Sequence, residues 1–277
     1  MQFTPPKKRS FLRLFVGRLY FKTRRYQDWF LRNKCFAHHQ GQITDFPFVC
    51  YHHESPLIRN LPKVQMILQY NKITNLKLAL HSINEIIIHP GETFSYWKLI
   101  GKPTPKKGYM DGIVLFNGQI KAGVGGGLCQ LSNLIYWMTL HTPLMIVERW
   151  RHSYDVFPDA GRTNPFGSGA TCAYPSLDLQ IFNPTKQPFL LNVYLTDTQL
   201  VGEWRTVKLQ QYQYKIYEEN HWITHEPWGG YLRHNILRRK SFNLNGDEVK
   251  DEFITENHAV MMYQPFIEDK EKWVVEK

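Results

Sequence analysis

One stretch of the sequence combines residue types that could do chemistry. Residues 123–130 read Gly-Val-Gly-Gly-Gly-Leu-Cys-Gln. Apolar residues then follow at helical spacing, namely Leu131, Leu134, Ile135 and Met138. This pattern predicts a buried helix with Cys129 in its first turn, where free N–H groups and the helix dipole stabilise a thiolate. Cys129 is therefore a candidate nucleophile. The alternative is a small core residue that follows a tight glycine turn.

The glycines before Cys129 have a use in such a site. Without a Cβ atom they let a substrate backbone approach closely, and their N–H groups could bind an oxyanion. Polar side chains nearby in the sequence could contribute to substrate binding. The candidate oxyanion and substrate-binding residues are Gly125, Gly126, Gly127, Gln130, Ser153 and Arg162.

A thiol nucleophile needs a base, and His152 is the candidate. It follows the next expected strand and lies in a polar segment. An imidazole there could remove a proton and return it, with a carboxylate to orient the ring. Asp155, Asp159 and Asp178 could each be that carboxylate, and the sequence does not choose between them. The alternative is a histidine that only hydrogen-bonds the loop.

The elements expected around this stretch predict an α+β fold. Residues 112–116 and 119–122 form a hairpin through an Asn-Gly type I′ turn, and residues 85–89 and 144–149 form further strands. We expect the helix that begins at Cys129 to pack on an antiparallel sheet. The patterning indicates a basic amphipathic segment at 1–40, a helical connector at 41–84 and a β-rich C-terminal part.

The positive charge of the chain is concentrated at its start. Residues 1–40 contain ten lysines and arginines against one aspartate, which accounts for nearly all of the formal net charge of +10. Aromatic and aliphatic residues alternate with these charges. This composition is typical of an amphipathic helix on an anionic membrane surface. The candidate membrane-binding residues are Arg13, Arg18, Lys22, Arg24 and Arg25.

Other interpretations of the basic segment remain open. It could pack on the rest of the protein or bind a partner protein, and nucleic acid is the least favoured because no DNA- or RNA-binding signature is present. Basic residues interrupt its apolar runs every few residues, so the segment has neither the uninterrupted apolar stretch of a spanning helix nor the apolar core of a signal peptide. With four cysteines in no regular framework, we expect reduced thiols and a cytoplasmic protein, peripheral on the inner membrane face.

No cofactor and no metal are predicted. The sequence has no P-loop, no dinucleotide fingerprint and no carboxylate cluster suited to magnesium. The spacing of Cys129, His141 and His152 matches no standard zinc pattern. The paired histidines at 38–39 and 52–53 are expected to be exposed to solvent.

Several motifs together resemble the VanW family. They are Gly91-Glu92-Thr93-Phe94-Ser95, Gly108-Tyr109, the glycine-cysteine stretch at 123–130, Glu148-Arg149, His152-Ser153, and Asp178-Leu179 with Asn183. The resemblance covers residues 85–206, which implies a core domain at 85–206 and a β-rich extension at 207–277. The segments 149–159 and 255–259 look like the short form of the family, found beside glycopeptide-resistance genes. At residues 161–164 this chain reads Gly-Arg-Thr-Asn where longer members commonly read Gly-Arg-Asp-Ala.

The resemblance implies a cell-wall role but no established activity. We therefore expect an accessory protein of glycopeptide resistance. It would be a thiol enzyme that acts on an acyl or peptide bond of a peptidoglycan precursor. The alternative is a non-catalytic protein that binds anionic lipid or lipid-linked cell-wall precursors at the membrane surface.

Overall fold

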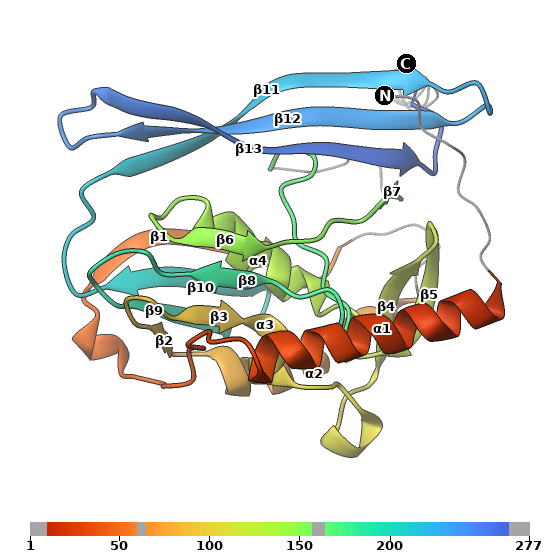
Figure 1. Cartoon of the computed structure of the whole chain (residues 1–277), viewed down its shortest axis with the longest axis horizontal. Coiled ribbons are helices and arrows are strands. Elements are labelled where there is room, and N and C mark those ends of the chain that lie inside the picture. The colour runs from red at the N-terminus through yellow and green to blue at the C-terminus, as the bar shows by residue number, and fades with distance from the viewer. Residues whose placement is uncertain (1–9, 60–64, 157–163, 266–277) are drawn as a thin grey trace.

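The structure is a computed structural model that describes residues 10–59, 65–156 and 164–265 (Figure 1). The helices are α1 (Phe11–Phe30), α2 (Met66–Ile83), α3 (Tyr96–Ile100) and α4 (Cys129–Thr139), with 3-10 turns at Ile43–Asp45 and Pro105–Lys107. The strands of the core are β1 (Phe48–Pro56), β2 (Ile86–Ile88), β3 (Thr93–Ser95), β4 (Asp111–Phe116), β5 (Gln119–Val124), β6 (Met145–Glu148), β8 (Gln180–Phe182), β9 (Phe189–Leu195) and β10 (Gln199–Thr206). The remaining strands are β7 (Tyr154–Asp155), β11 (Gln213–His225), β12 (Tyr231–Phe242) and β13 (Glu248–Met261). The expected α+β class is confirmed.

Helix α4 packs on an antiparallel sheet, as its sequence pattern predicts. The sheet has the strand order β1-β10-β9-β2, and a smaller sheet has the order β3-β8-β6. Gly202 on β10 allows α4 to come close, because a Cβ there would lie 2.6 Å from Met138 and 2.8 Å from Leu134. The absence of a side chain at Gly202 therefore allows the close approach of α4 to the sheet.

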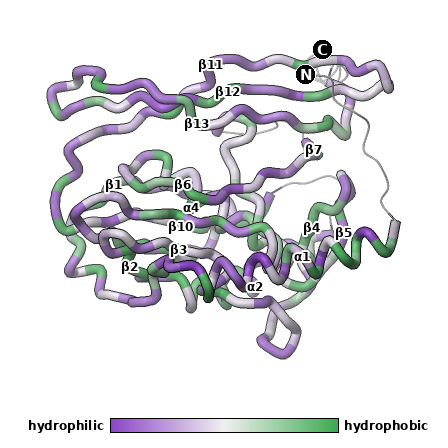
Figure 2. Tube along the Cα trace, viewed as in Figure 1, coloured by the Kyte–Doolittle hydropathy of each residue, from purple (hydrophilic) through white to green (hydrophobic). Residues whose placement is uncertain are grey.

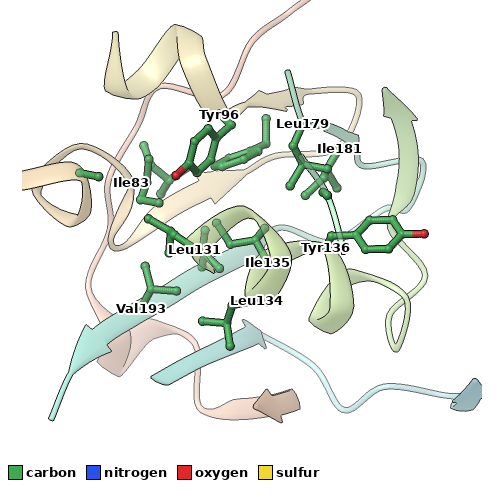
Figure 3. Close-up of a cluster of buried hydrophobic side chains, with 14 of the residues drawn as sticks. Ile83, Tyr96, Leu131, Leu134, Ile135, Tyr136, Leu179, Ile181 and Val193 are labelled. Carbon is green, nitrogen blue, oxygen red and sulfur yellow. The ribbon is translucent and has the colours of Figure 1, made fainter. Parts of the chain in front are cut away.

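The apolar face of α4 forms the centre of the core. Leu131, Leu134 and Ile135 are buried beside residues of the neighbouring elements, including Ile83, Tyr96, Leu179, Ile181 and Val193 (Figure 3). Each fully buried aliphatic side chain of this kind contributes about 1.5–3 kcal/mol through removal of apolar surface from water. The burial of this face explains why the helix forms where the sequence predicts it.

The β4–β5 hairpin leads directly into the glycine loop. Asn117 and Gly118 at its turn have φ angles of +50° and +74°, which are the two positive values that a type I′ turn requires. At the other end of the hairpin, Gly126 lies directly against Gly112, so that a Cβ on either residue would overlap the backbone of the other. Two facing glycines therefore allow the loop to fold back onto strand β4.

The C-terminal strands form a separate sheet above the core (Figure 1). Its strand order is β11-β12-β13-β7, and the short strand β7 pairs in parallel with β13. Strand β7 comes from the segment after β6, so this segment connects the core to the C-terminal sheet.

One sequence expectation about local structure is wrong. The segment 41–84 is not a purely helical connector, because β1 pairs with β10 at the edge of the main sheet. Here tertiary pairing decides the structure, and local residue preferences do not.

The contact between Gly112 and Gly126 makes a stability prediction. Gly126→Ala should lower the free energy of unfolding by about 1–3 kcal/mol, because the new methyl group meets rigid backbone. Urea unfolding followed by circular dichroism measures this. Gly17→Ala is the matched control, since nothing lies within 4 Å of the added Cβ and alanine favours the helix. An unchanged midpoint for Gly126→Ala would contradict the packing argument.

Candidate functional site

Cys129 is the first residue of α4, as expected, and it is half-buried. The sulfur donates to the carbonyl oxygen of Cys172 at 3.5 Å. Burial raises the pKa of the Cys129 thiol, and burial also raises the pKa of Cys172 well above its ordinary value. The expected lowering of the Cys129 pKa at the helix N-terminus is therefore wrong for this structure, since loss of solvation exceeds the effect of the helix dipole.

The N–H groups expected to bind an oxyanion donate to the protein itself. Gly125 donates to the carbonyl of Met110 at 3.0 Å, and Gly126 donates to that of Gly123 at 2.9 Å. Gly127 donates to the carbonyl of Ile113 at 2.9 Å, and the Gln130 N–H donates to Gly127 at 3.0 Å. None of these four backbone donors is available to a substrate in this arrangement, and the geometry gives their predicted role no support.

The space left by the missing Cβ atoms is also filled. A Cβ on Gly125 would lie 2.7 Å from Pro103, and a Cβ on Gly127 would overlap the side chain of Lys72. Lys72 is buried, donates to the carbonyl of Leu57, and has its pKa lowered by burial to about 8. The glycine loop is therefore packed against side chains of the protein, where the sequence suggested an open approach for a substrate.

The structure does not join His152 to Cys129 by a hydrogen bond. His152 lies between β6 and β7, and burial lowers its pKa. Asp155 instead accepts from Arg233 at 3.3 Å and from the hydroxyl of Tyr263 at 2.8 Å. The catalytic pairing of His152 with Cys129 therefore stays a prediction. It would require a conformation in which the two side chains form a hydrogen bond.

The other predicted binding residues are placed only in part. Ser153 is exposed, and its carbonyl accepts from the N–H of Val260 at 2.9 Å. The Gln130 side chain donates to the hydroxyl of Ser55 at 2.9 Å. Asp159 and Arg162 lie outside the described residues.

A buried charge network lies close to the thiols of Cys129 and Cys172. The Arg25 guanidinium from α1 donates to both carboxylate oxygens of Glu148, one of them at 2.8 Å. It also lies 3.4 Å from a carboxylate oxygen of Asp28 and 3.9 Å from one of Asp178. One cation therefore connects three acids that come from three distant parts of the sequence.

Asp178 is the most deeply buried member of this network. Its carboxylate accepts from the Ser95 hydroxyl at 2.5 Å, from the Trp97 N–H at 2.9 Å and from the Leu179 N–H at 3.0 Å. Burial nevertheless raises its pKa to about 6. Asp178 therefore binds backbone groups of α3 and of the segment before β8, and within the described residues it makes no hydrogen bond to His152.

The place of Arg25 corrects its sequence assignment. It is buried and paired with Glu148, so it is not available to a membrane. The other four candidates, Arg13, Arg18, Lys22 and Arg24, are exposed. No helix in the described ranges combines the length and the apolarity needed to cross a membrane.

The described residues offer no evident metal site. Nowhere in these ranges are three or more histidine, cysteine, aspartate or glutamate side chains grouped to hold an ion. The histidines at 52 and 53 lie on β1, where His53 is within 3.2 Å of the Asn164 side chain and His52 lies 3.3 Å from Glu54.

Comparison with known proteins assigns this chain to a family. The family described as VanW like protein matches residues 71–205. The vancomycin B-type resistance protein VanW of Enterococcus faecalis is 34% identical over 217 residues, which cover 78% of each chain. This chain belongs to the VanW family.

A second relative matches over a shorter range. The uncharacterized protein YoaR of Bacillus subtilis is 32% identical over 117 residues, 42% of this chain and 37% of that protein. No solved structure matches. In this VanW family member, motif residues such as Ser95, Glu148 and Asp178 meet in the buried charge network. Sequence reasoning identified these motifs but not the contact between them.

The burial of the cysteines predicts an order of chemical modification. Iodoacetamide should modify the exposed Cys35 first, and the half-buried Cys129 and the buried Cys172 should react more slowly, because burial raises their pKa. Mass spectrometry of the modified cysteines at pH 7 and pH 9 measures this order. Rapid reaction of Cys129 in the folded protein, slowed in His152→Ala, would contradict it and favour a thiol nucleophile.

The raised pKa of Asp178 predicts a pH dependence of stability. Asp178 titrates near 6 when folded and at about 3.9 when unfolded, so the folded state holds its proton more tightly. Its contribution to stability is therefore present at low pH and is lost as the pH rises from about 4 to about 6. The unfolding free energy of the wild type minus that of Asp178→Asn should fall across this range in urea titrations.

Asp251→Asn is the control for this pH experiment. The Tyr217 hydroxyl and Arg238 lower the pKa of Asp251, so its contribution has the opposite sign and is lost as the pH falls. A free-energy difference for Asp178→Asn that does not change between pH 4 and pH 6 would show that Asp178 stays ionised.

Proposed function

We propose that this protein is an accessory protein of glycopeptide resistance that works at an anionic membrane surface. Resistance is suggested by the name of the Enterococcus faecalis relative. The observation that carries the membrane assignment is the exposed part of α1. Between Phe11 and Arg24 no residue of this helix is buried. Its large exposed apolar side chains are Phe11, Leu12, Leu14, Phe15, Val16, Leu19, Tyr20 and Phe21.

The two ends of α1 have different environments. At its C-terminal end, Arg25, Asp28 and Trp29 are buried against the core. Trp29 donates to the Ser95 hydroxyl at 3.1 Å, and Lys98 donates to the Trp29 carbonyl at 3.1 Å. Packing on the core therefore explains the residues at the C-terminal end of α1. It does not explain the exposed apolar side chains at the N-terminal end.

Five of the eight large exposed apolar residues before Arg24 fall on one side of α1, and Phe11, Leu14 and Phe21 lie outside this arc. At about 100° per residue, Leu12, Phe15, Val16, Leu19 and Tyr20 fall in one arc of the helix. Arg13 and Arg24 flank this arc on one side, and Arg18 and Lys22 flank it on the other. Long basic side chains in such positions can reach lipid phosphates while the arc enters the headgroup layer. Figure 2 shows hydrophobic and hydrophilic residues interspersed along the helix.

A non-catalytic role agrees with the geometry near Cys129. The Cys129 thiol donates to the carbonyl of Cys172 and the N–H groups of Gly125, Gly126 and Gly127 are occupied, so these predicted groups are not arranged for acyl chemistry. We infer that the protein binds at the membrane, and that a lipid-linked cell-wall precursor is the class of ligand it would meet there. The observation that favours a thiol enzyme is the place of Cys129 at the start of α4. Unchanged resistance in a Cys129→Ala strain would exclude that enzyme.

Vesicle flotation tests the membrane proposal. The full chain should float with vesicles of phosphatidylglycerol and phosphatidylcholine, and much less with phosphatidylcholine alone. Replacing Arg13, Arg18, Lys22 and Arg24 with glutamine should weaken binding more than tenfold, because each charge near an anionic surface contributes about 1 kcal/mol. Equal binding to both vesicle types would reject the proposal.

A matched variant controls for net charge. Glutamine at Lys102, Lys106 and Lys107 removes three exposed lysines that lie outside α1, and this variant should bind as the wild type does. Serine at Leu12, Val16 and Leu19 keeps the charge and removes part of the apolar arc, so it should also reduce flotation. Retained binding in the serine variant would show a purely electrostatic association.

A further inference from the structure

Two segments far apart in the sequence meet at the junction of the core and the C-terminal sheet. Arg149, directly after β6, donates through Nη1 to the Thr255 hydroxyl at 3.2 Å and to the Asn257 side chain at 3.1 Å. The Val260 N–H donates to the carbonyl of Ser153 at 2.9 Å. Residues 149–155 therefore run alongside strand β13, and their side chains share one environment.

Arg149 brings a positive charge to this junction without an acid to neutralise it. Its other partners are the carbonyl oxygens of Gly167 and Gly169, and its guanidinium lies 4.9 Å from the ring of Tyr136. Within the described residues every partner of this guanidinium is electrically neutral. The hydrogen bonds hold the side chain in place, but the net charge remains.

Arg151 adds a second positive charge next to the first. Its Nη1 is closed off from solvent and has no hydrogen-bond partner, and no hydrogen bond or ion pair of Arg151 occurs within the described residues. Burial, together with the charge of Arg149, lowers the pKa of Arg151 to about 10. Glu256 offsets part of this charge, but its carboxylate is 44% exposed and lies 3.6 Å from Nε2 of His258.

The other arginines of the same sheet provide a contrast. Arg233 pairs with Asp155 at 3.3 Å, and Arg238 pairs with Asp251 at 3.0 Å. Arg239 donates to Glu252 through Nε at 2.7 Å. A partly buried guanidinium normally has such a partner, because an unpaired buried charge is costly. Arg151 has none within the described residues, so an anion from outside the chain would complete its environment.

We propose that Arg151, supported by Arg149, binds a phosphate-type oxyanion at the junction between the core and the C-terminal sheet. A guanidinium presents parallel N–H donors that match phosphate oxygens. Two adjacent cations favour a doubly charged phosphate group over a singly charged carboxylate. The site is independent of the membrane proposal, because α1 contributes no residue to it.

Isothermal titration with pyrophosphate tests the site in the full chain. Wild type should bind, and Arg151→Gln should bind at least tenfold more weakly. Arg238→Gln is the matched control, because it removes an arginine of the same sheet that is already paired. The variant with glutamine at Arg13, Arg18, Lys22 and Arg24 should bind pyrophosphate as the wild type does, which separates this site from α1.

Thermal unfolding gives a second readout. Without anion, Arg151→Gln should be at least as stable as the wild type, because it removes a charge that has no partner. Pyrophosphate should raise the melting temperature of the wild type and of Arg238→Gln, but not that of Arg151→Gln. Inorganic phosphate should act in the same direction, and acetate should have little effect.

Three results would overturn the proposal. The first is an equal rise in melting temperature for the wild type and Arg151→Gln. The second is loss of pyrophosphate binding in the α1 variant alone, which would place the anion on the membrane-facing helix. The third is a marked loss of stability in Arg151→Gln without anion, with Arg151→Lys restoring it, which would show that Arg151 is a structural residue.

Discussion

The attachment of α1 to the core depends on one buried cation. Arg25 faces the carboxylates of Glu148, Asp28 and Asp178, and removal of a cation from such a group leaves several charges without compensation in a region of low dielectric. Glu148 also accepts from the N–H of Asp178 at 3.1 Å. Strand β6, the segment before β8 and helix α1 are therefore held together by a single set of charges.

The glycine stretch has a structural explanation in this fold. Gly126 lies against Gly112, Gly125 against Pro103 and Gly127 against Lys72, so each position excludes a side chain for a different reason. The Asn75 side chain closes the arrangement by donating to the carbonyls of Gly126 at 2.9 Å and Met110 at 3.0 Å. A motif with the composition of a catalytic loop can thus serve to bring a hairpin, a helix and a strand into close contact.

Local patterns were sufficient to predict some elements of this fold. Helix α4 follows from its apolar spacing, and the β4–β5 hairpin follows from Asn117-Gly118, because the backbone angles of such a turn depend on neighbouring residues alone. Strand β1 was missed, since it is an edge strand with polar residues such as His52 and Glu54 and has no continuous apolar run.

The candidate site was harder to predict than the fold. The sequence shows that Cys129 begins a helix, but not that the sulfur donates to the carbonyl of Cys172. It shows that Arg25 is basic, but its partner Glu148 lies 123 residues away. Burial and charge pairing are set by contacts of this range, and a pattern read over one or two helical turns does not contain them. Family motifs indicated which residues matter without indicating that they pack together.

The two sides of α1 determine how the core is oriented at a surface, in addition to how the helix is attached to the core. Arg25, Asp28 and Trp29 point toward the core, whereas Leu12, Val16 and Tyr20 lie on the opposite side of the same helix at about 100° per residue. A helix is stiff over 20 residues, about 30 Å, so a surface that receives the apolar arc also determines how the core is turned relative to it. The protein would present the same side of its core to every such surface, and rotation about the helix axis would be restricted without any second attachment point.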